Sequence, residues 1–399
     1  MKSYLDLSPS PRVLMGPGPS DVHPRVLRAM ATPLLGHLDP EFLVLMNETR
    51  ELLQYVFQTQ NELTLPVPGT GSAGMEAAVC NLLEPGDTIV IGVNGYFGQR
   101  LSEMATRCGA QVVPVQVPWG RIVEPEDIAQ ALRGRQAKVV AVVHAETSTG
   151  VLQPLQPIAD LAHAHGALFL VDTVTSLGGH PVKVDEWGID VCYSGTQKCL
   201  SCPPGLAPIT LNARAAEVLH QRRTKVQSWY LDLSLVERYW GQERFYHHTA
   251  PISMNYALRE ALRLIYEEGL EARWQRHRLN HQALLAGLQA LGLEPFVADE
   301  EQRLWSLNAV RIPEGIEDAK VRAQLLQEFG IEIGGGLGEL KGRIWRVGLM
   351  GYSSSRRNVL LFLGALQHVL VAQGYSPQGS GVHAAGEVYR RATKEGEQP

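Results

Sequence analysis

Tyr193-Ser-Gly-Thr-Gln-Lys-Cys-Leu-Ser-Cys-Pro-Pro-Gly205 places a lysine, Lys198, on a tight turn directly after a short apolar run. The run at 191–193 is typical of a strand end, and the Pro-Pro-Gly at 203–205 cannot continue inside a helix or a strand. Lysine normally keeps its ammonium group in water, so this position is unusual for it. A desolvated lysine amine can instead condense with a carbonyl group to form a Schiff base. An ordinary surface lysine after a strand is the alternative interpretation.

On both sides of this stretch, apolar runs alternate with helical segments. The apolar runs predict strands at 63–67, 88–93, 111–117, 138–144, 167–172, 191–193 and 207–211. Helical spacing predicts helices between most of them, at 74–83, 97–107, 125–133 and 154–165. Strands that are apolar throughout and separated by helices indicate an α/β fold with a mostly parallel, seven-stranded sheet covered on both faces. Ligands of such sheets bind beyond the carboxyl ends of the strands, where Lys198 falls.

The pattern divides the chain into four parts. Residues 1–20 predict an extended N-terminal arm, and residues 21–265 predict the large domain. Long helices at 255–268 and 270–291 lead into residues 266–375, which predict a smaller α+β domain. Its strands are expected at 304–310, 331–333 and 344–347, and its helices at 318–329 and 355–372. Residues 376–399 combine glycine, serine and charge with little apolar content, which predicts a disordered tail.

The composition of the 399 residues argues against several functional classes. The net charge is only −5 and charged residues make up 19%, so no nucleic-acid partner is expected. No apolar run is long enough to cross a bilayer, and residues 1–11 lack the features of a secretory signal. Five cysteines are few for a disulfide scaffold and are typical of reduced thiols, so we expect a cytoplasmic protein without a membrane partner.

Cys199 and Cys202 form a C-x-x-C pair. A thioredoxin-like pair opens a helix, which the prolines at 203 and 204 prevent. A structural zinc site needs a second pair of ligands, and the sequence offers none at a suitable spacing. We therefore expect neither a redox pair nor a metal site.

The segment Gly69-Thr-Gly-Ser-Ala-Gly74 matches the G-x-G-x-x-G pattern, after a predicted strand and at the start of a predicted helix. Taken alone, it supports an NAD-dependent enzyme. The next strand, however, ends at Asn94, where a ribose-binding fold carries Asp or Glu. What remains is a helix N-terminus whose free N–H groups bind phosphate, assisted by the hydroxyls of Thr70 and Ser72. A purely structural glycine turn is a further alternative.

Three other side chains occupy positions that a ring-shaped cofactor requires. Asp172 closes an apolar strand. It is either a turn or helix-cap residue or the counter-ion of a protonated pyridine nitrogen. Arg346 lies in a strand of the second domain and faces either solvent or a substrate carboxylate. Phe97 packs in the core or lies flat on a heteroaromatic ring. One cofactor needs all of these groups, pyridoxal 5′-phosphate. It requires a lysine that reacts with its aldehyde, a carboxylate for its ring nitrogen, a phosphate-binding turn and an aromatic side chain against its ring.

These motifs resemble those of class V, fold-type I pyridoxal-phosphate aminotransferases, most of all the alanine–glyoxylate and serine–pyruvate aminotransferases. The resemblance covers residues 14–374. The large domain of this family corresponds to the large domain predicted at residues 21–265. It rests on Gly16-Pro-Gly-Pro-Ser20, the turn at 69–74, Asn94-Gly95, Glu146-Thr-Ser-Thr-Gly150, Val171-Asp-Thr-Val174, Ser194-Gly-Thr-Gln-Lys198, Tyr246-His-His-Thr249 and Trp345-Arg346.

The resemblance implies a role for each side chain around the cofactor ring. Lys198 would hold the cofactor covalently and later carry a proton between the substrate and the cofactor. Asp172 would pair with the ring nitrogen, while Phe97 and Val174 would lie against the two faces of the ring. Arg346 would bind the carboxylate of the amino acid.

The resemblance also implies a phosphate cup that two subunits of a homodimer share. Its members from the same chain would be Thr70, Gly71, Ser72 and Gln197. Tyr246 and Thr249 of the partner subunit would complete it, so the active sites would lie at the subunit interface. Thr147 would contact the cofactor near its phenolic oxygen.

The implied activity is transamination of a small amino acid, alanine or serine, with glyoxylate or pyruvate, which yields glycine or alanine and a 2-oxo acid. Ureidoglycine–glyoxylate transamination is a close alternative, and an NAD-dependent dehydrogenase is an alternative from another class. A cysteine desulfurase shares the fold but needs a loop cysteine, and no cysteine follows Cys202. The sequence leaves the amino donor open, because one hydroxyl in a tolerant pocket separates serine from alanine by only about 1–3 kcal/mol.

Overall fold

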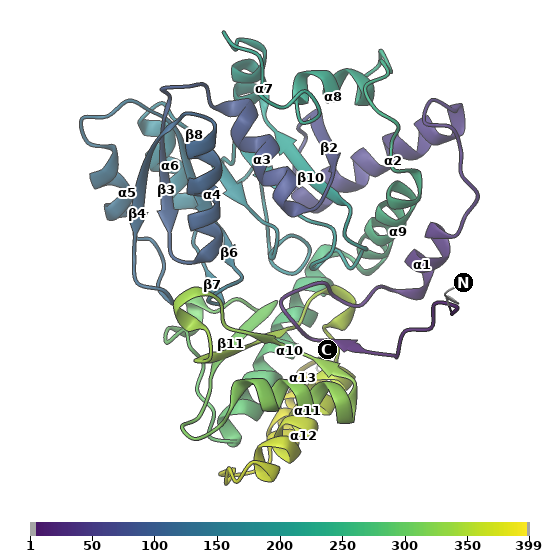
Figure 1. Cartoon of the computed structure of the whole chain (residues 1–399), viewed down its shortest axis with the longest axis vertical. Coiled ribbons are helices and arrows are strands. Elements are labelled where there is room, and N and C mark those ends of the chain that lie inside the picture. Colours follow the sequence, from purple (N-terminus) through teal and green to yellow (C-terminus); the bar gives the residue numbers. More distant parts are fainter. Residues whose placement is uncertain (1–4, 397–399) are drawn as a thin grey trace.

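Seven strands form the sheet of the large domain in the computed structural model, which describes residues 5–396 (Figure 1). They are β2 (Leu63–Pro68), β3 (Thr88–Val93), β4 (Gln111–Gln116), β5 (Ala137–Val143), β8 (Leu168–Asp172), β9 (Val191–Tyr193) and β10 (Leu206–Leu211). Their order across the sheet is β2-β10-β9-β8-β5-β3-β4. β10 runs antiparallel to both of its neighbours, and the other pairs are parallel. The prediction of a mostly parallel, seven-stranded α/β sheet is confirmed.

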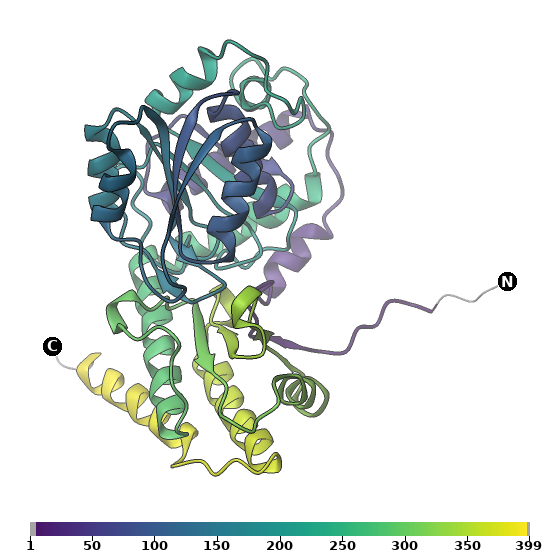
Figure 2. The ribbon, with the colours of Figure 1, turned by 60° about the vertical axis from the view of Figure 1, so that its left-hand side comes forward.

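Helices cover both faces of this sheet (Figure 2). They include α2 (Pro40–Phe57), α3 (Gly71–Leu82), α4 (Tyr96–Arg107), α5 (Pro125–Leu132), α6 (Gln156–Ala164) and α9 (Ile252–Glu268). Side chains alternate between the two faces: Ile89 and Ile91 of β3 belong to one core cluster, and Val90 belongs to another. The strands are apolar throughout because both of their faces are buried.

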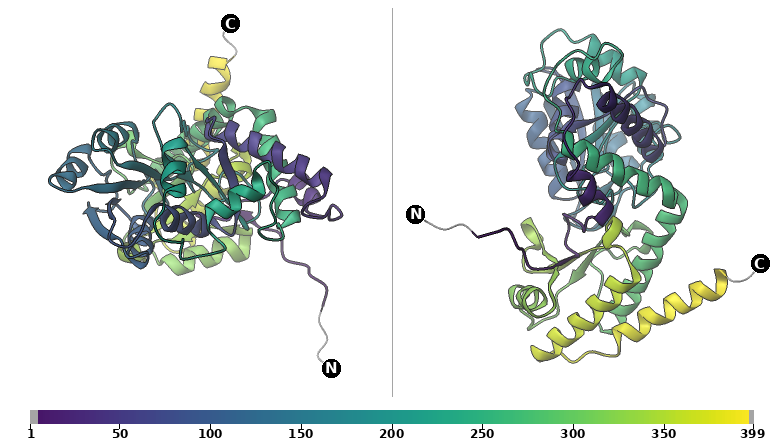
Figure 3. Two further views of the ribbon diagram at one scale, coloured as in Figure 1. Left: turned by 90° about the horizontal axis from the view of Figure 1, so that it is seen from above. Right: turned by 90° about the vertical axis from the view of Figure 1, so that its right-hand side faces the viewer.

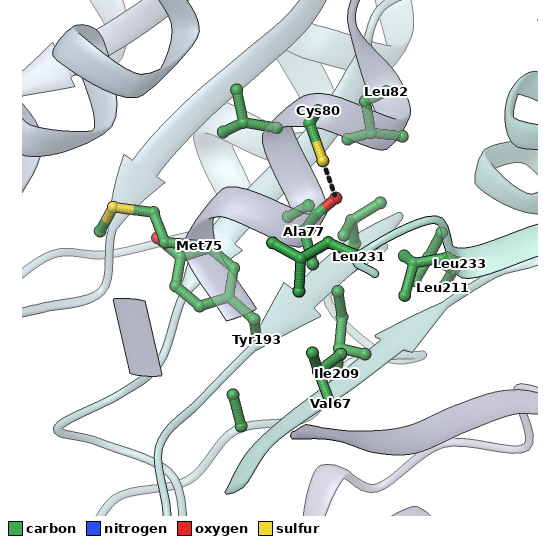
Figure 4. Packing of buried hydrophobic residues seen from close by; sticks show 14 of the residues in the cluster. Val67, Met75, Ala77, Cys80, Leu82, Tyr193, Ile209, Leu211, Leu231 and Leu233 are labelled. Atoms are coloured by element: carbon green, nitrogen blue, oxygen red, sulfur yellow. Dashed lines mark hydrogen bonds between the residues drawn. The ribbon is translucent and has the colours of Figure 1, made fainter. Parts of the chain in front are cut away.

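The helix α3 packs on the sheet through buried apolar side chains (Figure 4). Ala77 of α3 lies in the same buried cluster as Val67 of β2 and Ile209 of β10. Close approach depends on small residues, because a Cβ on Gly74 would lie 2.9 Å from the Cβ of Ala207. β2 and β9 are both antiparallel to β10, so their carboxyl ends lie at the same edge of the sheet.

The other elements of the large domain are short. They are α1 (Pro24–Met30), α7 (Ala213–His220), α8 (Leu233–Trp240) and the hairpin of β6 (Ala145–Glu146) with β7 (Val151–Leu152). Later in the part of the chain that the structure describes, there are three single-turn 3₁₀ helices, η1 (Glu300–Gln302), η2 (Gly338–Leu340) and η3 (Gly351–Ser353). Within residues 5–396, no helix combines the length and the apolar character that crossing a membrane requires.

The smaller domain lies below the large one in Figure 1 and is reached through the helix α10 (Leu270–Ala290). Its three-stranded antiparallel sheet has the order β11 (Leu307–Arg311), β14 (Ile344–Gly348), β13 (Gly334–Gly335). The helices α11 (Asp318–Phe329) and α12 (Arg356–Ala372) pack with α10 around a core of its own, which includes Trp345 and Phe362. The predicted α+β character of this segment agrees with these elements.

The prediction of a disordered tail at 376–399 is wrong for the part that the structure describes. A helix, α13 (Gly381–Gly396), packs against α10 and α12, and residues 397–399 lie outside the described residues. Ala385 and Tyr389, one turn apart, are buried in the core of the smaller domain. The hydroxyl of Tyr389 donates a 2.8 Å hydrogen bond to Oδ1 of Asn280. Few apolar residues suffice here because α10 and α12 both pack against this helix.

The predicted N-terminal arm, residues 1–20, joins the two domains; its residues 1–4 lie outside the described residues. Residues 5–12 extend away from the molecule (Figure 3). The strand β1 (Val13–Leu14) pairs in parallel with β12 (Ile331–Glu332) of the smaller domain. Beyond it, the hydroxyl of Ser20 donates a 2.8 Å hydrogen bond to the backbone carbonyl of Lys198. The arm therefore contacts the lysine turn directly.

Candidate active site

A cavity of about 190 Å³ lies at the carboxyl ends of β2, β8 and β9. Nine of the predicted site residues line it: Thr70, Gly71, Ser72, Phe97, Thr147, Asp172, Val174, Gln197 and Lys198. Drug-sized ligands occupy pockets of about 300–1,000 Å³. The cavity therefore suits a small cofactor better than a dinucleotide.

A larger cavity of about 470 Å³ lies on the other side of the lysine turn, where Ser201 lines it. Its charged side chains already have ion-pair partners: Glu268 pairs with Arg273 and Arg276, and Glu267 pairs with Arg25. No reactive group of the kind found at Lys198 lines it, so the smaller cavity is the candidate active site.

Lys198 is buried, and its amine points at the arm. The amine donates a hydrogen bond to the backbone carbonyl of Pro17. Gly18 leaves room for it, because a Cβ there would lie 2.6 Å from Nζ. Burial, together with the positive charge of Arg346, lowers the pKa of Lys198 to about 8. About a tenth of this amine is therefore neutral, and nucleophilic, near pH 7, far more than for a lysine with its ordinary pKa.

Asp172 ends β8 and is buried at the cavity wall. Its Oδ1 accepts a 2.8 Å hydrogen bond from the backbone N–H of Val174, and its Oδ2 accepts a 2.9 Å bond from the hydroxyl of Tyr193. Burial raises the pKa of Asp172 to about 6, and these two hydrogen bonds oppose the rise. The carboxylate still predominates at pH 7, so the cavity holds a fixed anion.

The first turn of α3 supplies unused hydrogen-bond donors. Thr70 is the N-cap residue, and its side chain makes no capping hydrogen bond. Within the described residues, the N–H groups of Gly71 and Ser72 have no acceptor. The buried amide of Gln197 also leaves its Oε1 without a partner, and rotation of the amide can present its NH₂ instead. Free donors at a helix N-terminus fit an anion such as the phosphate of pyridoxal phosphate.

Phe97 and Val174 both reach the cavity. Phe97 is the second residue of α4, and its side chain is partly buried. A methyl group of Val174 would lie 3.1 Å from a Cβ on Gly71, so the valine packs against the helix terminus. The cavity thus has an aromatic and an aliphatic wall, as a flat heteroaromatic ring requires.

Arg346 lies in the middle of the small antiparallel sheet, but it is buried, with only 6% of its surface exposed. The interpretation as a solvent-facing arginine is therefore wrong. Its Nε donates to the carbonyl of Gly335 at 2.7 Å and its Nη1 to the carbonyl of Thr147 at 3.3 Å. Burial lowers the pKa of Arg346 to about 10. No described carboxylate lies within 4.0 Å of it, so the guanidinium can accept an anionic ligand.

Thr147 ties this arginine to the cavity. Its hydroxyl pairs with that of Thr175 at 2.5 Å, close to the turn that follows Asp172. Tyr246 and Thr249, in contrast, lie outside the cavity of this chain. Both side chains are exposed, Tyr246 with 53% of its surface.

Three residues of the site were missed by the sequence analysis. Tyr193 contacts Asp172, as described above, and Arg100 lines the cavity beside Ser72. Glu146 is fully buried and accepts hydrogen bonds from the backbone N–H groups of Phe97 and Gly98 at 3.1 and 3.3 Å. Burial raises the pKa of Glu146 to about 7. The available signal was an acidic residue in an apolar context, which Glu146 shares with Asp172.

Within the described residues, no three His, Cys, Asp or Glu side chains gather in a way that could hold a metal ion. The polar side chains that line the cavity carry an amine, a guanidinium, hydroxyls, an amide and one carboxylate. This set fits an organic anion with a carbonyl group better than a metal ion.

Comparisons with known proteins match almost the whole chain. A profile of the aminotransferase class-V family matches residues 14–340. Alanine–glyoxylate aminotransferase of Callithrix jacchus is 42% identical, over 91% of this chain and 89% of that protein. The solved alanine–glyoxylate aminotransferase from Nostoc sp. is 52% identical, with a TM-score of 0.91 over 92% of this chain and 98% of that chain. The solved ureidoglycine–glyoxylate aminotransferase from Bacillus subtilis is 46% identical, with a TM-score of 0.95 over 97% of this chain and 100% of that chain.

Proposed function

Because this chain belongs to the class-V aminotransferase family, we propose that it transfers the amino group of a small amino acid to glyoxylate. It is a fold-type I aminotransferase, and its cofactor is pyridoxal 5′-phosphate. The glycine turn at 69–74 is therefore part of an aminotransferase, and the NAD-dependent dehydrogenase interpretation no longer applies. Glyoxylate is the substrate that the names of both groups of relatives share.

The observation that carries this proposal is that the amine of Lys198 and the carboxylate of Asp172 line one cavity with an open helix N-terminus. When bound there, pyridoxal phosphate supplies an electron sink for the bond that breaks at the substrate Cα. Asp172 keeps a proton on the ring nitrogen, and Phe97 and Val174 hold the ring flat between them. The unused donors of the first turn of α3 bind the phosphate.

Lys198 would take the proton from Cα of the donor amino acid and, in the second half-reaction, would deliver a proton to Cα of the glycine that forms from glyoxylate. Its pKa of about 8 lies near the working pH, where general acid–base catalysis is most effective. Arg346 binds the substrate carboxylate with its free N–H groups and so orients the Cα–H bond toward Lys198. Glu146 and Thr147 hold Phe97 and Arg346 in place through the hydrogen bonds given above.

A lysine variant tests this assignment. Lys198→Ala should remain folded but lose the visible absorbance of covalently attached cofactor, whereas Lys183→Ala, a partly exposed control, should keep it. The measurement is absorbance after borohydride reduction and denaturation, with mass spectrometry of the modified peptide. Retention of reduced cofactor in Lys198→Ala would overturn the assignment.

The amino donor is a choice between alanine, serine and ureidoglycine. Alanine is supported by the 52% identity to the Nostoc protein, and ureidoglycine by the TM-score of 0.95 to the Bacillus protein. Rates with alanine, serine, glycine and ureidoglycine, each against glyoxylate and pyruvate, decide between them. If kcat/KM with ureidoglycine exceeds that with alanine and serine by more than tenfold, ureidoglycine is the amino donor in place of alanine or serine.

A homodimer with shared active sites is part of the proposal. Tyr246 lies in an exposed aromatic surface with Trp229, Tyr230 and Phe245, which are 63%, 43% and 50% exposed. A second copy of the chain would bury this surface and bring Tyr246 and Thr249 to the phosphate cup. Co-expressed Lys198→Ala and Tyr246→Ala subunits should then regain activity, because mixed dimers contain one intact site. If the two variants are inactive alone and remain inactive when co-expressed, the active site is not shared between subunits.

We place the enzyme in the cytoplasm. All five cysteines are free and buried in the structure, which suits a reducing compartment. Cell fractionation with a marker enzyme for each compartment tests this placement.

A further inference from the structure

Arg100 is a cation of the candidate active site that no step of the proposed reaction uses. It lies one turn after Phe97 on α4, so both side chains face the cavity. Its Nη1 donates a 3.1 Å hydrogen bond to Oγ of Ser72, in the first turn of α3. Its guanidinium carbon lies 4.9 Å from the centre of the Phe97 ring. The side chain therefore joins the aromatic wall to the open helix N-terminus.

The charge balance of the phosphate cup requires a cation. A phosphate monoester carries a charge of about −1.5 to −2 at pH 7. The cup residues from this chain, Thr70 to Ser72 and Gln197, are neutral, and a helix N-terminus contributes only about half an elementary charge. Arg100 and Lys198 are the two cations that line the cavity, and the amine of Lys198 is needed for the cofactor's aldehyde.

Arg100 is also free to take an anion. No carboxylate of residues 5–396 lies within ion-pair distance of its guanidinium, whereas Arg107, on the same helix, pairs with Glu103 at 2.9 Å. Arg100 is partly buried, has no carboxylate partner, and contacts a serine hydroxyl and the rings of Tyr96 and Phe97. It is therefore well placed for a bidentate contact with phosphate.

We propose that Arg100 binds the phosphate group of the cofactor, as the cationic member of the cup formed by Thr70, Gly71, Ser72 and Gln197. This assignment rests on the proposed function, because it assumes that pyridoxal phosphate binds in this cavity. The competing explanation is that Arg100 only supports the ring of Phe97. The two explanations differ in which part of the cofactor they affect.

The test compares two cofactor forms that differ by the phosphate group alone. Apo-protein with Arg100→Met is titrated with pyridoxal 5′-phosphate and, separately, with pyridoxal, and binding is followed by tryptophan fluorescence. Loss of a charge-assisted contact should weaken pyridoxal phosphate about 10- to 100-fold, with pyridoxal changed less than about twofold. Equal weakening of both forms would show that Arg100 acts through Phe97, and no weakening of either would also overturn the proposal.

Matched variants complete the experiment. Arg100→Lys keeps the positive charge but loses the two parallel N–H donors of the guanidinium. Its affinity for pyridoxal phosphate should therefore lie between those of the wild type and Arg100→Met. Arg107→Met removes an exposed cation from the same helix and should bind both forms as the wild type does. Inorganic phosphate should compete with pyridoxal phosphate in the wild type and compete at least about fivefold less well in Arg100→Met. These last fold-changes follow from the net value of one charged hydrogen bond.

The outcomes separate this inference from the proposed function. If wild-type apo-protein forms no adduct with pyridoxal phosphate, the proposed function fails. If the adduct forms and the ratio of the two affinities is the same in the wild type and in Arg100→Met, only the role of Arg100 fails. Circular dichroism of each variant shows that the fold is retained.

Discussion

The hydroxyl of Tyr193 donates a 2.9 Å hydrogen bond to Oδ2 of Asp172, and the two residues stand opposite each other at the carboxyl ends of β8 and β9. Tyr193 is fully buried, and burial raises its pKa above its usual value, so the hydroxyl stays protonated and can donate. The bond leaves the other oxygen of Asp172 to the N–H of Val174. The carboxylate is thus held in one orientation at the cavity wall.

Tyr193→Phe should move the acid limb of the activity profile to higher pH. The hydrogen bond from Tyr193 lowers the pKa of Asp172, so its loss raises that pKa further above its ordinary value. Activity that requires the Asp172 anion is lost as the pH falls through this pKa, and a higher pKa means an earlier loss. The measurement is kcat/KM against pH between 4.5 and 8.5. An unchanged acid limb would show that Asp172 does not depend on this tyrosine.

Attachment of the cofactor to Lys198 should speed up as the pH rises through about 8, because the neutral amine is the nucleophile. Burial is the main cause of the lowered pKa, and the charge of Arg346 lowers it further. Arg346→Gln should therefore shift the profile to higher pH. Stopped-flow absorbance of apo-protein mixed with pyridoxal phosphate gives the rates. A profile that stays in place in Arg346→Gln would remove Arg346 from this account.

Gly18→Ala should displace Lys198. An added Cβ would lie 2.6 Å from Nζ and 2.8 Å from Cδ, and the backbone of Gly18 has φ +112°, which side chains rarely adopt. We expect a loss of stability of about 1 kcal/mol or more and slow cofactor attachment. Gly86→Ala is the control, because it has φ +90° with no atom within 4 Å of the added Cβ. It should lose stability and still attach cofactor at the wild-type rate; equal rates in both variants would contradict the prediction.

Tyr389→Ala should destabilise the smaller domain, because α13 buries this ring against its core. The expected loss is about 3–5 kcal/mol, by analogy with other buried aromatic residues. Tyr389→Phe removes only the bond to Asn280 and should lose about 1 kcal/mol. Urea unfolding measures both, with the exposed Arg391→Ala as a control expected to change by less than about 0.5 kcal/mol. A small effect of Tyr389→Ala would mean that α13 adds little to the fold.

Much of the fold follows from local periodicity. The predicted helix at 318–329 coincides with α11. In the large sheet, the observed strand ends lie within one or two residues of the predicted ends. The tail at 376–399 was misjudged because its helix has only a few buried positions, among them Ala385 and Tyr389. Such a helix is stabilised by the surface that α10 offers, and local composition does not record that surface.

The alternation of buried strands and helices follows from the amino-acid sequence alone, and so does the parallel sheet at whose edge Asp172 and Lys198 lie. Burial patterns repeat over a few residues, so they can be read along the chain. Three contacts of the site are visible only in the folded molecule: the hydroxyl of Tyr193 reaches Asp172, Arg100 meets Ser72, and Arg346 is buried beside the carbonyl of Thr147, 199 positions away. Those contacts depend on strand register, helix packing and the docking of two domains, which no local pattern encodes.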